Sequence, residues 1–202
     1  MAGTGVCGTQ GQGGPLASAE LWDPVAVAVD GTGDLLVADS GDQSVLLAPA
    51  SGGTFYGTPV GTGDLGVVVG GTGSYGPYLA DGLAATGVAA ELNDPRGLAV
   101  GHDGALFVTD GFMHVSRVVP AGTGSLLGRP MTAGDLYTAA GALPVTTAQG
   151  TGDGTRWVLI RMATPSGVVV SAPGLACPAR LARRQRPTGR VFVQSLLSRR
   201  RR

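Results

Sequence analysis

The side chains best placed for chemistry are carboxylates at the ends of apolar runs. Asp39 and Asp110 each close the pattern Leu-x-Val-x-Asp. A carboxylate there can accept backbone N–H bonds and fix the following turn. It can also bind a metal or a substrate. We expect the turn role for both residues, and the second reading stays open.

Other catalytic groups are sparse. The chain has two histidines, His102 and His114, which is too few for a His-rich metal centre. It has no Gly-x-Ser-x-Gly motif, and neither Cys7 nor Cys177 has a His partner by pattern. We therefore predict no metal and no cofactor, and the sequence does not support catalysis.

The elements that position these residues recur every 71 residues. Residues 19–39 align without a gap on residues 90–110, with eleven of twenty-one positions identical. A third copy begins at Met162. Each copy contains short Val- and Leu-rich runs between Gly- and Asp-rich turns, which indicates strands and hairpins. The predicted strands span residues 25–29, 35–38, 44–48 and 65–69, then 97–100, 106–109, 115–119 and 136–140.

Runs such as VAVAV and LLVA are apolar on both faces. Strands of this kind need a neighbour on each side, as in tandem four-stranded β-propeller blades. Within this pattern, Leu21–Asp39 and Leu92–Asp110 read Leu-x-Asp-Pro, an apolar run, a turn, then Leu-x-Val-x-Asp. This pattern resembles the NHL-repeat β-propeller proteins, and the long spacers resemble those of bacterial NHL proteins.

The expected fold is all-β: a partial propeller of about three four-stranded NHL-type blades with a disordered Arg-rich C-terminal tail. The propeller part spans residues 1–178, with units near 19–70, 90–141 and from 162–174 onward. The tail spans residues 179–202. It carries nine of the fourteen arginines and no acid, whereas all fourteen acids lie at or before Asp153. The tail is either an artefactual, non-functional segment or an electrostatic arm for nucleic acid or anionic membrane.

Long connections on a rigid scaffold are where recognition usually occurs. In a four-stranded meander, the turn between the second and third strands and the link to the next blade share one side. That side brings together the candidate ligand-binding residues Tyr75, Tyr78, Asp81, Glu91, Asp94, Arg96 and His114. The opposite side carries the shorter turns around Thr32 and His102.

The resemblance implies an interaction or sensor module, since NHL propellers are mostly of that kind. The leading hypothesis is a non-catalytic scaffold that binds a protein, glycan or small ligand through loops on one face. One alternative is a propeller-type hydrolase or lyase with a channel metal, and another is a truncated gene product without activity. Uncovered blade faces predict self-association. The chain as written lacks a signal peptide, which predicts a cytoplasmic protein, or a secreted or cell-surface one if it is a fragment.

Overall fold

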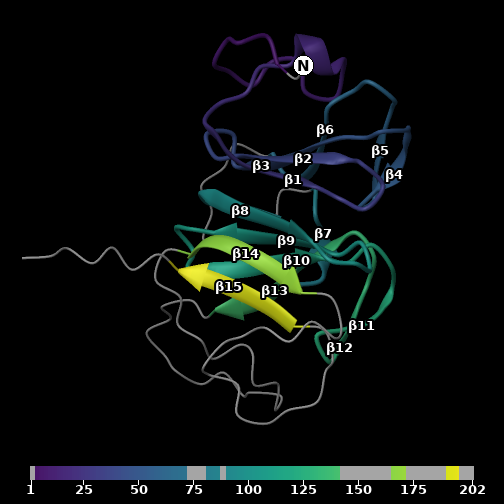
Figure 1. Cartoon of the computed structure of the whole chain (residues 1–202), viewed down its shortest axis with the longest axis vertical. Coiled ribbons are helices and arrows are strands. Elements are labelled where there is room, and N and C mark those ends of the chain that lie inside the picture. Colours follow the sequence, from purple (N-terminus) through teal and green to yellow (C-terminus); the bar gives the residue numbers. More distant parts are fainter. Residues whose placement is uncertain (1–2, 72–80, 87–89, 142–164, 172–189, 196–202) are drawn as a thin grey trace, which may run out of the picture.

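The described part of the chain is almost entirely β-structure. The computed structural model describes residues 3–71, 81–86, 90–141, 165–171 and 190–195 (Figure 1). Within these ranges one short 3-10 turn, η1 (Leu16–Ser18), accompanies the strands. No helix in these ranges has the length and hydropathy needed to cross a membrane. The all-β class predicted from the repeat is confirmed.

Two four-stranded antiparallel meanders form the body, and we call them the first and the second unit. The first unit has the strand order β1-β2-β3-β6 and carries the hairpin β4–β5 between β3 and β6. Its strands are β1 (Pro24–Val29), β2 (Leu35–Asp39), β3 (Ser44–Ala48), β4 (Gly53–Phe55), β5 (Thr58–Val60) and β6 (Gly66–Gly70). The short hairpin was not predicted, because its strands are three residues long.

The second unit repeats this plan. Its strands run in the order β8-β9-β10-β13, with β7 added outside β13 and a hairpin β11–β12 between β10 and β13. They are β7 (Leu83–Ala84), β8 (Pro95–Val100), β9 (Leu106–Asp110), β10 (Val115–Val119), β11 (Gly124–Leu126), β12 (Arg129–Met131) and β13 (Asp135–Gly141). The principal strands of both units agree with the predicted ranges to within two residues at each end.

The backbone repeats as closely as the sequence does. In the described residues, six non-glycine residues have positive φ, and they form three pairs separated by 71 residues: Asp23 and Asp94, Gln43 and His114, Tyr56 and Leu127. Each member of the last pair precedes a glycine that also has positive φ. Two consecutive positive φ angles make the type I′ turn that suits a two-residue hairpin loop. The repeat therefore encodes the turns as well as the strands.

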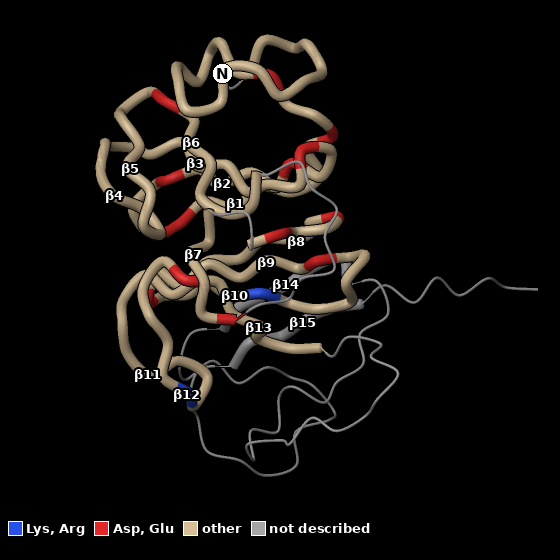
Figure 2. Tube along the Cα trace, turned by 180° about the vertical axis from the view of Figure 1, so that it is seen from behind, with Lys and Arg blue, Asp and Glu red and all other residues tan. Residues whose placement is uncertain are grey.

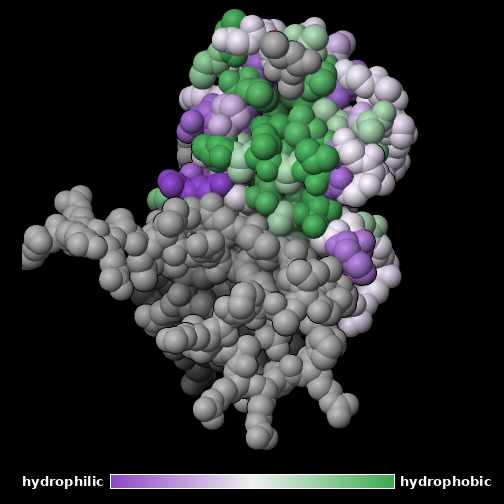
Figure 3. Space-filling model, viewed as in Figure 1, coloured by the Kyte–Doolittle hydropathy of each residue, from purple (hydrophilic) through white to green (hydrophobic). Residues whose placement is uncertain are grey.

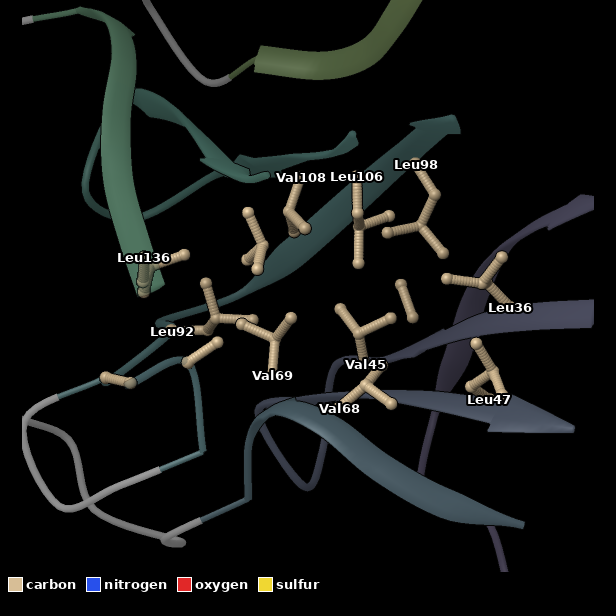
Figure 4. Packing of buried hydrophobic residues seen from close by; sticks show 14 of the residues in the cluster. Leu36, Val45, Leu47, Val68, Val69, Leu92, Leu98, Leu106, Val108 and Leu136 are labelled. Carbon is tan, nitrogen blue, oxygen red and sulfur yellow. The ribbon is translucent and has the colours of Figure 1, made fainter. Parts of the chain in front are cut away.

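A single apolar cluster lies between the two units (Figure 4). From the first unit come Leu36, Ala38, Val45, Leu47 and Val68, and from the second Leu98, Leu106, Val108, Val119 and Leu136. The Tyr56 hydroxyl also donates a hydrogen bond of 3.0 Å to the Gly104 carbonyl across the junction. Apolar burial of this extent is the main force that fixes the units against each other.

Each unit is also covered by the spacer that leads into it. Before the first unit, Gly13 N–H donates to the Leu65 carbonyl at 2.7 Å, and Leu65 N–H donates to the Gly14 carbonyl at 2.9 Å. Before the second unit, Gly82 N–H donates to the Leu136 carbonyl at 3.0 Å. Each spacer thus hydrogen-bonds to the outer edge of the sheet that it leads into.

A third sheet consists of β14 (Pro165–Ser171) and β15 (Arg190–Ser195), which pair antiparallel. The strand β14 corresponds to β1 and β8, whereas β15 comes from the Arg-rich segment. The prediction of disorder throughout residues 179–202 is therefore wrong for 190–195. The run Val191-Phe192-Val193 has the β-branched and aromatic composition that favours a strand. The remainder of that tail lies outside the described residues.

Burial on both faces, expected for every apolar strand, does not hold for β1. Its residues Val25, Val27 and Val29 are exposed, although β2 and β3 are almost wholly buried. The physical reason is that the first unit has the second unit on one side and only part of a spacer on the other.

Candidate functional site

One end of the two units carries the β2–β3 and β9–β10 loops, the start and end of the link between the units, and three of the seven predicted site residues. The pairings Pro24 with Asp39, Asp39 with Ser44, and Ser44 with Gly70 place the start of β1, the β2–β3 loop and the end of β6 together. The second unit has the same arrangement. We call this end the loop rim. It consists of residues 22–23 and 40–43 from the first unit and residues 93–96 and 111–114 from the second.

Asp39 fixes the rim of the first unit. Its carboxylate accepts the Trp22 backbone N–H at 3.0 Å and 2.9 Å through its two oxygens. The side chain is fully buried, and burial raises the pKa of Asp39 to about 6 even though the Trp22 hydrogen bond favours the ionised form. The bond ties the end of β2 to the chain entering β1, so Trp22 is held in a defined position.

Asp110 makes the equivalent contacts in the second unit. It accepts the Asn93 N–H at 2.6 Å and the Met113 N–H at 2.9 Å. Burial again raises the pKa, to about 6, against these two hydrogen bonds and the nearby Arg117. Because both oxygens accept backbone N–H groups, Asp110 organises the β9–β10 loop from within and is not presented to solvent.

A polar cluster joins the two units at the rim. The Ser40 hydroxyl donates to Asp94 Oδ1 at 3.0 Å, and Arg96 Nε donates to Asp94 Oδ2 at 2.5 Å. Gly111 lies directly against this pair, since a Cβ at Gly111 would come within 2.7 Å of Arg96 side-chain atoms. Arg96 keeps nearly half of its side chain exposed, at 48%. The guanidinium is therefore fixed in direction and still accessible.

Two exposed aromatic side chains stand at the same rim. Trp22 is 48% exposed and Phe112 is 65% exposed. The Trp22 carbonyl accepts Gly41 N–H at 2.7 Å, and its ring packs so closely that a Cβ at Gly41 would come within 2.5 Å of Trp22 Cγ. Phe112 N–H donates to the Asn93 carbonyl at 3.1 Å. The rim thus presents large apolar surfaces from a fixed backbone.

The structure divides the seven predicted ligand-binding residues. Asp94, Arg96 and His114 lie at the rim, and His114 occupies the positive-φ position just before β10. Glu91 is buried, so it lies behind the rim surface. Tyr75 and Tyr78 lie outside the described residues.

Asp81 lies away from the rim, against the outer part of the second unit. It accepts Thr138 N–H at 2.7 Å and forms an ion pair of 2.6 Å with Arg129. Its partner Thr138 lies in the middle of β13, not at the rim end of that strand. Asp81 therefore holds the spacer to the sheet.

Sequence reasoning missed Trp22, Phe112 and Ser40. The aromatic pair could have been found where the two copies differ, because the repeat places Asn93 opposite Trp22 and Gly41 opposite Phe112. A large side chain that replaces a small or polar one at a turn is a signal of surface use. Ser40 becomes notable only through its contact with the neighbouring unit.

The opposite end of the units carries the β1–β2 and β8–β9 turns and the longer β3–β6 and β10–β13 connections, which contain the two short hairpins. Asp30 accepts hydrogen bonds from Thr32 N–H at 2.9 Å, Thr32 Oγ1 at 2.7 Å and Asp34 N–H at 2.9 Å. Burial raises the pKa of Asp30, but these hydrogen bonds lower it by more. Within the described residues, no group of three or more His, Cys, Asp or Glu side chains is arranged to hold a metal ion. These carboxylates serve their own turns.

Comparison with known proteins places the chain only loosely. No protein-family model and no curated protein matches it. Among solved structures it is similar to a structural genomics protein of unknown function from Bacteroides thetaiotaomicron, with 20% identity and a TM-score of 0.43, over 67% of this chain and 27% of that one. It is also similar to an auxiliary nutrient binding protein from the same organism, with 17% identity and a TM-score of 0.44, over 70% and 31% of the two chains. The chain spans less than a third of either structure, and neither similarity assigns a function to it.

Proposed function

We propose that this chain is a non-catalytic binding scaffold made of NHL-type propeller blades, which recognises a protein or glycan partner through the loop rim. The blade assignment is supported by two four-stranded meanders that stack face to face at a fixed repeat. Such stacking is how propeller blades bury both sheet faces. The rim is the end where the loops of both units meet the link between them and where Trp22, Phe112 and Arg96 are accessible.

The observation that carries the proposal is the pair of exposed aromatic rings at the rim, Trp22 and Phe112. Aromatic residues and Arg are enriched where protein surfaces bind partners, and here Arg96 lies in the same rim. The Asp39 and Asp110 hydrogen bonds hold the backbone around both rings. A preorganised surface loses little conformational freedom on binding.

The chemistry of the rim favours recognition over catalysis. Its two buried carboxylates accept backbone N–H groups, and the more accessible Asp94 is paired with Arg96 and Ser40. An aromatic surface with one directed guanidinium suits a flat or ring-shaped ligand surface. We therefore keep protein and glycan as the two partner classes.

The test combines a printed glycan array with a displayed peptide library, each probed with the full chain and with the double variant Trp22→Ala, Phe112→Ala. We expect the double variant to lose at least tenfold in affinity for any ligand found, because buried aromatic anchors carry a large share of binding energy. The matched control is Thr32→Ala with His102→Ala at the opposite end, which should bind as the parent does. Equal losses of affinity in both variants would refute the assignment of ligand binding to the loop rim.

A further inference from the structure

The first unit carries a rim carboxylate that lacks the partner of its counterpart. Asp23 and Asp94 lie 71 residues apart, and both have positive φ, at 62° and 70°. In the second unit Arg96 Nε donates to Asp94 Oδ2, whereas the first unit has Val25 at the place of Arg96. Asp23 is exposed, and within the described residues its carboxylate makes no hydrogen bond or ion pair. The first unit thus keeps the acid of this pair and lacks its cation.

An exposed indole lies directly beside this carboxylate. The second unit has Asn93 where the first has Trp22, and Trp22 is 48% exposed. The Trp22 carbonyl accepts Gly41 N–H at 2.7 Å, and the Asp23 carbonyl accepts Ser40 N–H at 3.1 Å. The backbone therefore holds both residues against the β2–β3 loop. A cation is attracted to the face of an aromatic ring, most strongly to that of Trp.

Val25 leaves open the place that Arg96 fills in the second unit. Its side chain is shorter than that of Arg and 45% exposed. It begins the exposed apolar surface of β1, and Figure 3 shows a hydrophobic area on the first unit, over β1 as placed in Figure 1. Because Asp23 is exposed as well, a side chain from another molecule can reach its carboxylate.

The charge of the first unit favours a cation at this place. Residues 3–71 contain seven acids and no Lys or Arg. A second rim carboxylate, Asp42, lies in the β2–β3 loop next to Gly41. A surface of this sign attracts positively charged partners and disfavours phosphate and sulfate groups. The ring and the charge thus point separately to the same chemistry.

We propose that Trp22 and Asp23 bind an arginine side chain of a protein partner, with its guanidinium on the indole and paired with Asp23 as Arg96 is paired with Asp94. The proposal rests on the proposed function and selects protein as the partner class. Arginine fits better than lysine, because its planar guanidinium stacks on aromatic rings and gives two parallel hydrogen bonds to a carboxylate.

The contact does not depend on where the chain begins. The Asp94–Arg96 pair lies within one unit, and Ser40 from the neighbouring unit donates to the other oxygen of Asp94, Oδ1. A unit packed before the first in the same way would therefore leave free the oxygen of Asp23 that corresponds to Asp94 Oδ2.

The experiment is an NMR titration of the nitrogen-15-labelled full chain with the blocked peptide Gly-Ser-Arg-Ser-Gly, at about 0.15 M salt to screen non-specific attraction. Trp22→Phe assigns the Trp22 indole signal. We expect that signal to shift and saturate. The same peptide with citrulline, an uncharged analogue of arginine, should bind about tenfold more weakly, and the lysine peptide should lie between the two.

Two variants test the pairing with Asp23. Asp23→Asn removes the charge and tolerates positive φ, and it should weaken the arginine peptide about fivefold. Val25→Arg supplies the cation of the second unit within the chain and should weaken the peptide to a similar extent, whereas Val25→Glu should bind at least as tightly as the parent. The charge-matched control is Asp103→Asn, at an exposed acid of the opposite end, which should stay within about twofold.

Equal binding of the arginine and citrulline peptides would overturn the proposal, and so would arginine binding that Asp23→Asn leaves unchanged. Equal effects of Val25→Arg and Val25→Glu would also overturn it, because charge would then not matter. A library or array ligand that needs Trp22 and Phe112 and carries no cation would keep the loop rim and remove this inference. Equal losses in Trp22→Ala and in the Thr32→Ala, His102→Ala control would remove both.

Discussion

Leu46 in the first unit and Arg117 in the second occupy equivalent positions of β3 and β10, and both are fully buried. Leu46 packs with Ala19 and Leu65 in an apolar cluster. Arg117 instead donates to Thr138 Oγ1 at 2.7 Å and lies 3.6 Å from Asp81 Oδ1. One backbone plan thus accepts either an aliphatic side chain or a guanidinium at the same place.

The surroundings explain how the charge is tolerated. The first unit has Gln10 and Val67 where the second has Asp81 and Thr138. Burial lowers the pKa of Arg117, while Asp81 and Asp110 raise it. In Figure 2 the acidic positions lie in both units, whereas blue segments are seen at β10 and beside β12 of the second unit. The difference teaches that the repeat conserves backbone turns, while each interface sets its own side-chain chemistry.

The largest effect should come from placing a guanidinium like that of Arg117 at the equivalent buried position of the first unit, Leu46. Leu46→Arg would bury a guanidinium with no acid at position 10, and we expect a loss of about 4–5 kcal/mol in the free energy of unfolding. Urea denaturation followed by circular dichroism measures it. Leu46→Met is the matched control and should cost less than about 1.5 kcal/mol. A well-folded Leu46→Arg protein would show that the first unit has room for charge and would break the comparison.

The next largest effect should come from removing Asp81, the carboxylate beside Arg117 in the second unit. Asp81→Ala leaves the buried Arg117 without its nearest carboxylate, and we expect a loss of about 3 kcal/mol. The equivalent change in the first unit, Gln10→Ala, touches an exposed side chain and should stay within about 0.5 kcal/mol. The same denaturation experiment compares them. Equal effects at the two positions would mean that Asp81 does not compensate Arg117.

Replacing the whole network by the first unit's residues should have a smaller effect of opposite sign. Asp81→Gln, Arg117→Leu and Thr138→Val together remove the ion pair and the buried guanidinium that needs it. Replacements of this kind are often neutral or stabilising, and we expect a gain of about 2 kcal/mol. Thermal and urea unfolding of the triple variant give the value. A loss as large as that of Asp81→Ala would show that the network contributes net stability.

A further effect concerns pH and a feature that both units share, the raised pKa of the aspartate at the end of β2 and of β9. Asp110 has a pKa of about 6 in the folded protein, above the ordinary value of 3.8. The folded state therefore holds a proton that the unfolded chain has lost, and the free energy of unfolding falls as pH rises from about 4 to about 6. Asp110→Asn should remove about half of that fall, with Asp39 supplying the other half. A variant whose pH dependence matches the parent would contradict the raised pKa.

The sequence by itself determined the all-β class, the strand positions and the turns. Glycines such as Gly33 and Gly104 recur 71 residues apart because equivalent turns require a residue with positive φ. The placement of Asp39 and Asp110 at strand ends was also visible, since turn chemistry is local. Local backbone requirements leave a direct imprint on residue type, so pattern reasoning reaches them.

Only the tertiary structure decided which side chains face solvent and which units touch. Val27 and Leu98 are equivalent and both aliphatic, yet one is exposed and the other buried, because only the second has a unit stacked against it. Asp81 lies away from the rim where it was predicted, because Arg129 and Thr138 hold it against β13. Strand β15 pairs with β14 although eighteen residues separate the two strands in the sequence. Contacts between distant segments depend on the neighbours that folding supplies, and no local pattern records them.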